Sequence, residues 1–107
     1  VDEAGHDAGW MGEKYMHSVR RTCDEIERLL AALNDEYVVI FTADHGGHER
    51  SHGTDMPEDM TIPMFFCGAP FEKGRELPAA SIMDIAPTVA HLLGALPARE
   101  WEGNVIG

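Results

Sequence analysis

The sequence has 107 residues, enough for one small domain with one hydrophobic core. Its net charge of −11, from 19 acidic and 8 basic side chains, argues against a nucleic-acid polymer as partner, because phosphate backbones need a basic surface. No apolar run approaches the roughly 18 residues that a membrane-spanning helix requires, so we expect no membrane partner.

The first ten residues contain no basic leader followed by an apolar segment, so we expect no signal peptide and a cytoplasmic protein. They do not begin with methionine and run directly into a candidate motif, so we expect an internal piece of a longer protein. Cys23 and Cys67 form no CxxC pair, and we expect both to be reduced thiols in the core.

Residues 12–33 carry apolar side chains at steps of three and four, which predicts a surface helix of about twenty residues. Its expected apolar face consists of Tyr15, Val19, Cys23, Ile26, Leu30 and Leu33. The β-branched and aromatic run at 37–43 predicts a strand that is buried on both faces. A helix that leads into such a strand is typical of an α/β layered sheet.

Residues 44–61 show neither the apolar period of a helix nor that of a strand, and they are rich in Gly, His and Asp. This predicts a long loop at the C-terminal end of the strand, where open α/β sheets bind ligands. Residues 62–67 predict a second strand. Asp84 as N-cap, Pro87 in the first turn and Gly94 as terminator predict a second helix. We therefore expect one flank of an α/β/α sandwich with a mostly parallel sheet.

The string HERSH at 48–52 matches the H-E-x-x-H pattern of zinc peptidases. That chemistry needs a helix, because only helical geometry places His48 and His52 on one face with Glu49 beside them as the base. Glycines flank the string on both sides and no apolar stripe accompanies it. We therefore reject the peptidase interpretation.

A different metal site explains the same loop. Asp44 and His45 follow the buried strand, and the two glycines after them free the backbone to turn both side chains toward one cation. His52 follows seven residues later, while Asp2 and His6 stand four apart, the spacing of one helical turn. Aspartate and neutral histidine are good zinc ligands, and the lack of cysteine pairs favours an open catalytic site.

With these residues, the sequence resembles the alkaline phosphatase superfamily, specifically its type I phosphodiesterase and nucleotide pyrophosphatase branch. No single motif is decisive, but their order and spacing match the C-terminal part of the catalytic domain over nearly the whole chain. The motifs are Asp2-x-x-x-His6, Thr42-Ala43-Asp44-His45-Gly46-Gly47, His52-Gly53, Thr61-Ile62-Pro63 and Asp84-x-x-Pro87-Thr88.

The resemblance implies two divalent metal ions, zinc or alternatively manganese, roughly 4 Å apart. By position, Asp2, His6 and His52 would hold one ion, and Asp44 and His45 the other. The family completes the second ion with a further aspartate and a Ser or Thr nucleophile, which have no counterpart in this sequence. We therefore expect no catalytic nucleophile in this chain and no activity from the chain alone.

The resemblance implies hydrolysis of a phosphodiester or phosphoanhydride, with a small phosphate ester as substrate. A sulfatase or a phosphomutase of the same superfamily is the alternative, and a non-catalytic metal-binding segment is another. Residues 1–107 would form the C-terminal portion of a single domain and contact the remainder of that domain. For His48, the functional role that we consider is contact with the substrate, and the alternative is a solvated loop histidine. We expect Trp10 and Trp101 to pack in the core.

Overall fold

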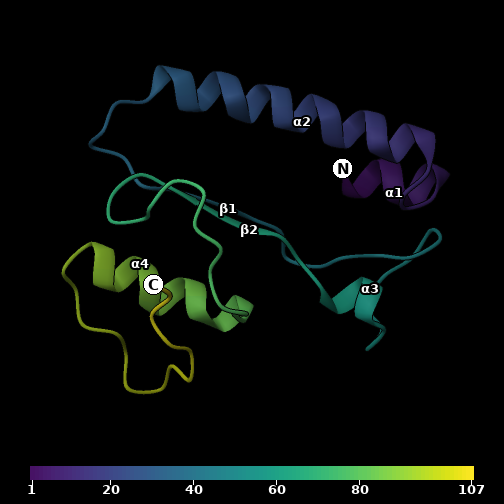
Figure 1. Cartoon of the computed structure of the whole chain (residues 1–107). Helices are drawn as coiled ribbons and strands as arrows, with labels where there is room; N and C mark the ends of the chain where they lie inside the picture. The colour runs from purple at the N-terminus through teal and green to yellow at the C-terminus, as the bar shows by residue number, and fades with distance from the viewer. The chain divides into compact units, whose positions relative to one another are not determined.

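The computed structural model describes all residues from 1 to 107, which form two compact units, Val1–Ala69 and Pro70–Gly107. The elements in chain order are α1 (Asp2–Ala8), α2 (Glu13–Ala32), β1 (Val39–Thr42), α3 (Pro57–Met60), β2 (Met64–Cys67), the 3₁₀ helix η1 (Ile82–Asp84) and α4 (Ile85–Leu92) (Figure 1). This content confirms the mixed α/β class. None of the helices has both the length and the apolar composition to cross a lipid bilayer.

The two helices at the start of the first unit pack against each other. Gly9, with φ of 96°, ends α1 and lets the chain turn into α2. The long helix and its half-buried apolar face are confirmed, except at Cys23, which is exposed. Cys67 is exposed as well, so the prediction of core thiols is wrong for both.

The strands β1 and β2 form an antiparallel pair in which Val39 faces Cys67 and Thr42 faces Met64. The only strand pair is thus antiparallel, whereas the sequence predicted a mostly parallel sheet; α/β domains often carry one antiparallel strand on such a sheet. The residues of β1 are half-buried, so the prediction of a strand buried on both faces is wrong for this chain. With only two strands, neither side of β1 is fully covered.

The second unit is organised around Asp84. Its carboxylate accepts the backbone N–H groups of Asn104 and Ser81, both at 2.7 Å, and these hydrogen bonds hold its pKa below the usual value. Asp84 does stand at the N-cap of α4, as predicted, but its side chain makes no cap hydrogen bond to that helix. Thr88, only 1% exposed, donates to the Asp84 carbonyl and accepts the N–H of Ile106. The Asp-x-x-Pro-Thr motif therefore ties the C-terminal tail to α4.

Apolar burial is shallow throughout the chain. Ala90, at 8% exposure, and Pro87 are the buried apolar side chains, and both lie on α4. The other two buried side chains of note, Asp59 and Thr88, are polar and fully hydrogen-bonded. Polar networks therefore fix much of the local structure.

Candidate metal centre

The helix α1 supplies the first two side chains of the site. Asp2 and His6 are four residues apart, so they lie on the same face of α1, one turn from each other. The Oδ1 atom of Asp2 lies 3.5 Å from Nε2 of His6. The predicted pairing of these two residues is therefore present in the structure.

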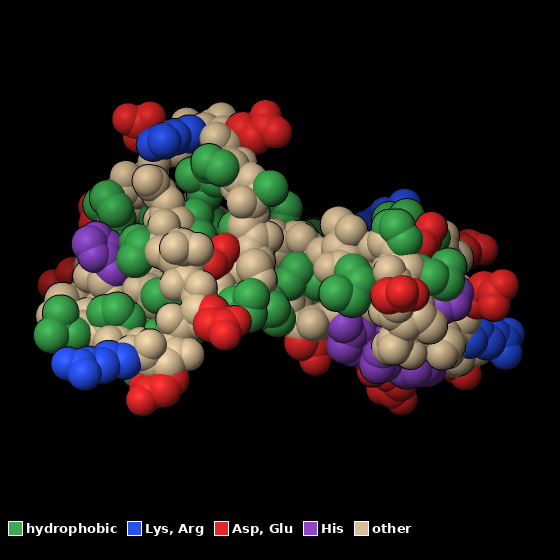
Figure 2. All heavy atoms as spheres, turned by 90° about the horizontal axis from the view of Figure 1, so that it is seen from below, with side chains coloured by type: hydrophobic (Ala, Val, Ile, Leu, Met, Phe, Trp, Pro, Cys, Tyr) green, Lys and Arg blue, Asp and Glu red, His purple; other side chains and the backbone are tan.

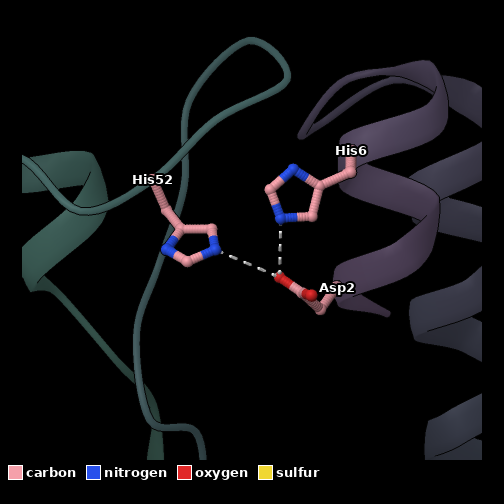
Figure 3. Close-up of side chains that lie close together, drawn as sticks. All are labelled: Asp2, His6 and His52. Atoms are coloured by element: carbon pink, nitrogen blue, oxygen red, sulfur yellow. Dashed lines mark ion pairs between the residues drawn. The ribbon is translucent and has the colours of Figure 1, made fainter.

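The loop after β1 brings two more imidazoles to the same carboxylate. Oδ1 of Asp2 lies 3.6 Å from Nε2 of His45 and 3.7 Å from Nε2 of His52. The rings of His45 and His52 are stacked, with centroids 3.6 Å apart and planes 15° apart. Figure 3 shows Asp2 pointing between His6 from α1 and His52 from the loop, and Figure 2 shows histidine side chains gathered beside acidic ones on one part of the surface.

Backbone carbonyls orient two of these rings. Nδ1 of His6 lies 2.9 Å from the carbonyl oxygen of Arg50, and Nδ1 of His45 lies 2.7 Å from that of Gly46. A carbonyl oxygen only accepts, so Nδ1 of each ring donates to it, and Nε2 is the nitrogen that faces Asp2 and is available to a metal ion. The Gly46 carbonyl, which stabilises the protonated ring, raises the pKa of His45. This arrangement, with one ring nitrogen held by the backbone and the other open, is typical of histidine metal ligands.

The donor set fits a divalent metal ion. The ligand atoms of Asp2, His6 and His52 all lie within 4.8 Å of one another. Zinc bonds of about 2.0–2.2 Å in a tetrahedral site place neighbouring donors about 3.4 Å apart, close to the 3.5 and 3.7 Å seen from Asp2 to the two rings. One carboxylate and two neutral imidazoles also match the nitrogen and oxygen ligands that zinc and manganese accept.

The fifth predicted ligand, Asp44, lies at the edge of this group. Its side chain is 87% exposed, and its Oδ1 atom lies 3.7 Å from Nε2 of His45. The structure thus brings Asp2, His6, His45 and His52 together, and Asp44 reaches them only through His45. The two sets of ligands that the resemblance assigns to separate ions meet at His45, whose Nε2 atom lies 3.6 Å from Oδ1 of Asp2 and 3.7 Å from Oδ1 of Asp44.

The string HERSH is not helical. His48 and Ser51 pair as an isolated antiparallel bridge, and Glu49 adopts a positive φ of 49°. The prediction that this string is not helical is therefore confirmed. His48 instead donates through Nδ1 to Oδ1 of Asp59 at 2.7 Å.

The pair of His48 and Asp59 sets an expected pH dependence of stability. The hydrogen bond from His48, with two from Thr54, lowers the pKa of Asp59 from 3.8 to about 2, while the Asp59 carboxylate raises the pKa of His48 above 6.5. Because the pKa of Asp59 is lower in the folded protein, its carboxylate stabilises the fold fully above the unfolded pKa of 3.8. This stabilisation is lost as the pH falls toward 2. Because the pKa of His48 is higher in the folded protein, its protonated ring stabilises the fold fully below pH 6.5. This stabilisation is lost as the pH rises through the pKa that His48 has in the folded protein.

We therefore expect the difference in unfolding free energy between the metal-free wild type and Asp59→Asn to be largest between about pH 4 and 6.5. Urea denaturation at a series of pH values measures this difference. Asp7 and Asp84 also have lowered pKa values, but both carboxylates remain in the variant, so their contributions cancel. A difference that stays constant from pH 2 to pH 9 would contradict the assignment.

Two residues that support the site were missed as functional residues in the sequence. Trp10 contacts the rings of His6 and His52, with centroid distances of 5.1 and 5.9 Å. Asp59 is 3% exposed and lies under the loop, although it was assigned to the loop without a role. No periodic signal marks either residue; the nearest hint is the glycine at position 47, where an added Cβ atom would lie 2.1 Å from the indole of Trp10.

Comparison with known proteins identifies the family of the chain. Residues 9–95 match the sequence model of the family described as Sulfatase. The chain is 31% identical over 89 residues to a phosphopentomutase of Acetivibrio thermocellus and 32% identical over 83 residues to one of Symbiobacterium thermophilum. These alignments cover 82% and 77% of the chain but only 23% and 21% of the relatives, so the chain spans less than a quarter of their length.

No solved structure matches the chain. The relatives are phosphopentomutases, so the comparisons support the superfamily and not the phosphodiesterase and nucleotide pyrophosphatase branch that the motifs suggested. Sulfatase and phosphomutase family members use divalent metals, which agrees with the donor set around Asp2. The chain belongs to the sulfatase family, within the alkaline phosphatase superfamily of metal-dependent enzymes.

Proposed function

We propose that the protein is a metal-dependent phosphoryl-transfer enzyme of the phosphomutase type, which acts on a small sugar phosphate. The observation that carries the proposal is the position of one carboxylate oxygen, Oδ1 of Asp2, within 3.5 to 3.7 Å of Nε2 of His6, His45 and His52. The phosphopentomutase relatives, at 31% and 32% identity, support a mutase over a phosphodiesterase.

In this proposal Asp2, His6 and His52 hold one divalent ion, and Asp44 and His45 hold a second. Zinc is the first candidate for both, and manganese is the alternative. A bound divalent cation lowers the pKa of a hydroxyl group and offsets the charge on a phosphoryl group. The net charge of −11 makes such cations favourable partners for this chain.

In this proposal the side chains of residues 1–107 bind the metal ions and orient the substrate. The Asp2 carboxylate would supply negative charge to the first ion, while the carbonyls behind His6 and His45 hold Nδ1 of each ring and leave Nε2 of His6 free for the first ion and Nε2 of His45 free for the second. His48 is the proposed substrate contact, because Asp59 holds its Nδ1 and leaves Nε2 to meet a phosphate oxygen. We propose that the attacking hydroxyl comes from the remainder of the catalytic domain, so residues 1–107 alone are inactive.

The test is an assay of the full-length protein loaded with zinc or manganese. A pentose phosphate is the expected substrate, and phosphorus NMR detects its positional isomer as the product. The His52→Ala variant, which removes one imidazole of the first set, should lose this activity. The exposed His17→Ala variant on α2 serves as control and should retain it.

A sulfatase is the second candidate, because the family model that matches residues 9–95 carries that description. Turnover of a sulfate ester with no isomerisation of the sugar phosphate would favour it. Cleavage of bis-p-nitrophenyl phosphate alone would restore the phosphodiesterase interpretation. Failure of all three substrates with metal still bound at the site would favour a non-catalytic metal-binding protein.

A further inference from the structure

The carboxylate of Asp59 is the most buried charged group of the chain. The residue is 3% exposed and lies in the short helix α3. Oδ1 accepts Nδ1–H of His48 at 2.7 Å, and Oδ2 accepts both the backbone N–H of Thr54, at 2.8 Å, and its hydroxyl, at 2.7 Å. All these partners belong to the loop between β1 and α3, so the side chain reaches away from its own helix.

The backbone of α3 holds the same loop at a second place. The carbonyl of Asp59 accepts the N–H of Gly46 at 2.8 Å, and that of Glu58 accepts the N–H of Gly47 at 2.9 Å. A Cβ atom at position 46 would lie 2.0 Å from the Glu58 carbonyl oxygen, so only glycine allows this approach. The loop is therefore fixed directly after His45.

The two sets of hydrogen bonds enclose the loop part of the candidate metal centre. Gly46 follows His45 in the chain, while His48 and Thr54 lie on either side of His52. Between them, the carbonyl of Arg50 accepts Nδ1–H of His6. Each imidazole around Asp2 is thus positioned by a segment that α3 anchors.

We propose that Asp59 is a positioning residue that sets the metal affinity of the site by ordering the loop that carries His45 and His52. The inference rests on the proposed metal-binding function. Asp59 is not itself a ligand, because both oxygens are used by the loop and it does not belong to the group of Asp2, His6 and His52. A loop that is ordered before binding does not have to lose conformational entropy when the ion arrives.

The test is the zinc affinity of Asp59→Asn in the full-length protein, measured by competition with a chromophoric chelator. Asparagine keeps the size of the side chain but removes its charge, and its NH₂ group can meet Nδ1 of His48 only if that nitrogen gives up its proton, so the charge-assisted hydrogen bond to His48 is lost. We expect the dissociation constant for zinc to rise about 10-fold, at the lower end of the 10- to 100-fold range for a group bonded to a ligand itself, because Asp59 acts through the loop and not on a ligand directly. Asp55→Asn removes the same charge from an exposed position in the same loop, so zinc affinity should not change.

A second variant covers the case in which Asp59→Asn does not fold. Thr54→Val removes the hydroxyl hydrogen bond to Oδ2 and the acceptor of the Met56 N–H but keeps the bond from its own backbone N–H to Oδ2, so we expect a smaller rise in the dissociation constant. An unchanged affinity in a folded Asp59→Asn protein, or in Thr54→Val if the first variant is unfolded, would overturn the inference.

The affinity of an Asp2→Asn variant separates this failure from failure of the proposed function. If Asp2→Asn loses zinc and folded Asp59→Asn keeps it, the metal site stands and only the positioning role fails. If Asp2→Asn keeps wild-type affinity, the proposed metal site fails and the positioning role fails with it.

Discussion

Replacing Asp2 with asparagine is expected to weaken zinc binding by more than about 100-fold, beyond the 10- to 100-fold effect of losing a group behind the ligands. Oδ1 of Asp2 is the one carboxylate oxygen that lies within 3.7 Å of three imidazole rings. Asparagine keeps the shape but removes the negative charge that offsets the cation. Competition with a chromophoric chelator measures the loss in the full-length protein.

Glu3→Gln is the matched control for Asp2→Asn. Glu3 is the next residue in α1, is also exposed, and does not belong to the group of ligand atoms. Its loss changes the net charge by the same amount. Equal losses of affinity in the two variants would show that overall charge and not coordination attracts the ion, and would contradict the site.

The parts of the fold that follow from local periodicity could be predicted from the sequence. The apolar steps of three and four predicted α2, and the β-branched run predicted β1, although β1 is shorter than residues 37–43. The helix α3 was missed because four residues are too few to show a helical period. The direction of β2 depends on how the intervening loop returns, which no local pattern encodes.

The candidate site shows the same division. Asp2 and His6 could be paired from their spacing alone, because one helical turn fixes their separation. His45 and His52 meet Asp2 through long-range contacts, and the family resemblance, not spacing, indicated their place. Asp59 carries no such signal, because an acidic residue in a loop is usually solvated, and only the folded chain shows that it is buried.

Trp10 is the residue whose removal should most weaken the contact between α1 and the loop. An added Cβ atom at Gly5 would lie 2.6 Å from the indole, and one at Gly47 would lie 2.1 Å from it, so the ring packs against both backbones. The backbone N–H of Trp10 also donates to the carbonyl of Glu49 at 2.6 Å. The indole therefore joins the helix that carries Asp2 and His6 to the loop that carries His52.

Trp10→Ala is expected to lower the unfolding free energy of the metal-free protein by about 2–3 kcal/mol, less than the 3–5 kcal/mol of a fully buried aromatic residue, because Trp10 is only half-buried. The cavity should also let His6 and His52 move apart, so zinc affinity should fall. Urea denaturation and chelator competition measure the two effects.

Trp10→Phe and Trp101→Ala define how specific the effect is. Phenylalanine keeps a flat ring between the two glycines, so it should restore most of the stability and zinc affinity that alanine loses. Trp101 is 46% exposed and belongs to the second unit, so its replacement should leave zinc affinity unchanged. If Trp10→Ala keeps both stability and affinity, the indole does not join α1 to the loop, and the metal centre must rely on the hydrogen bonds of Arg50 and Glu49 alone.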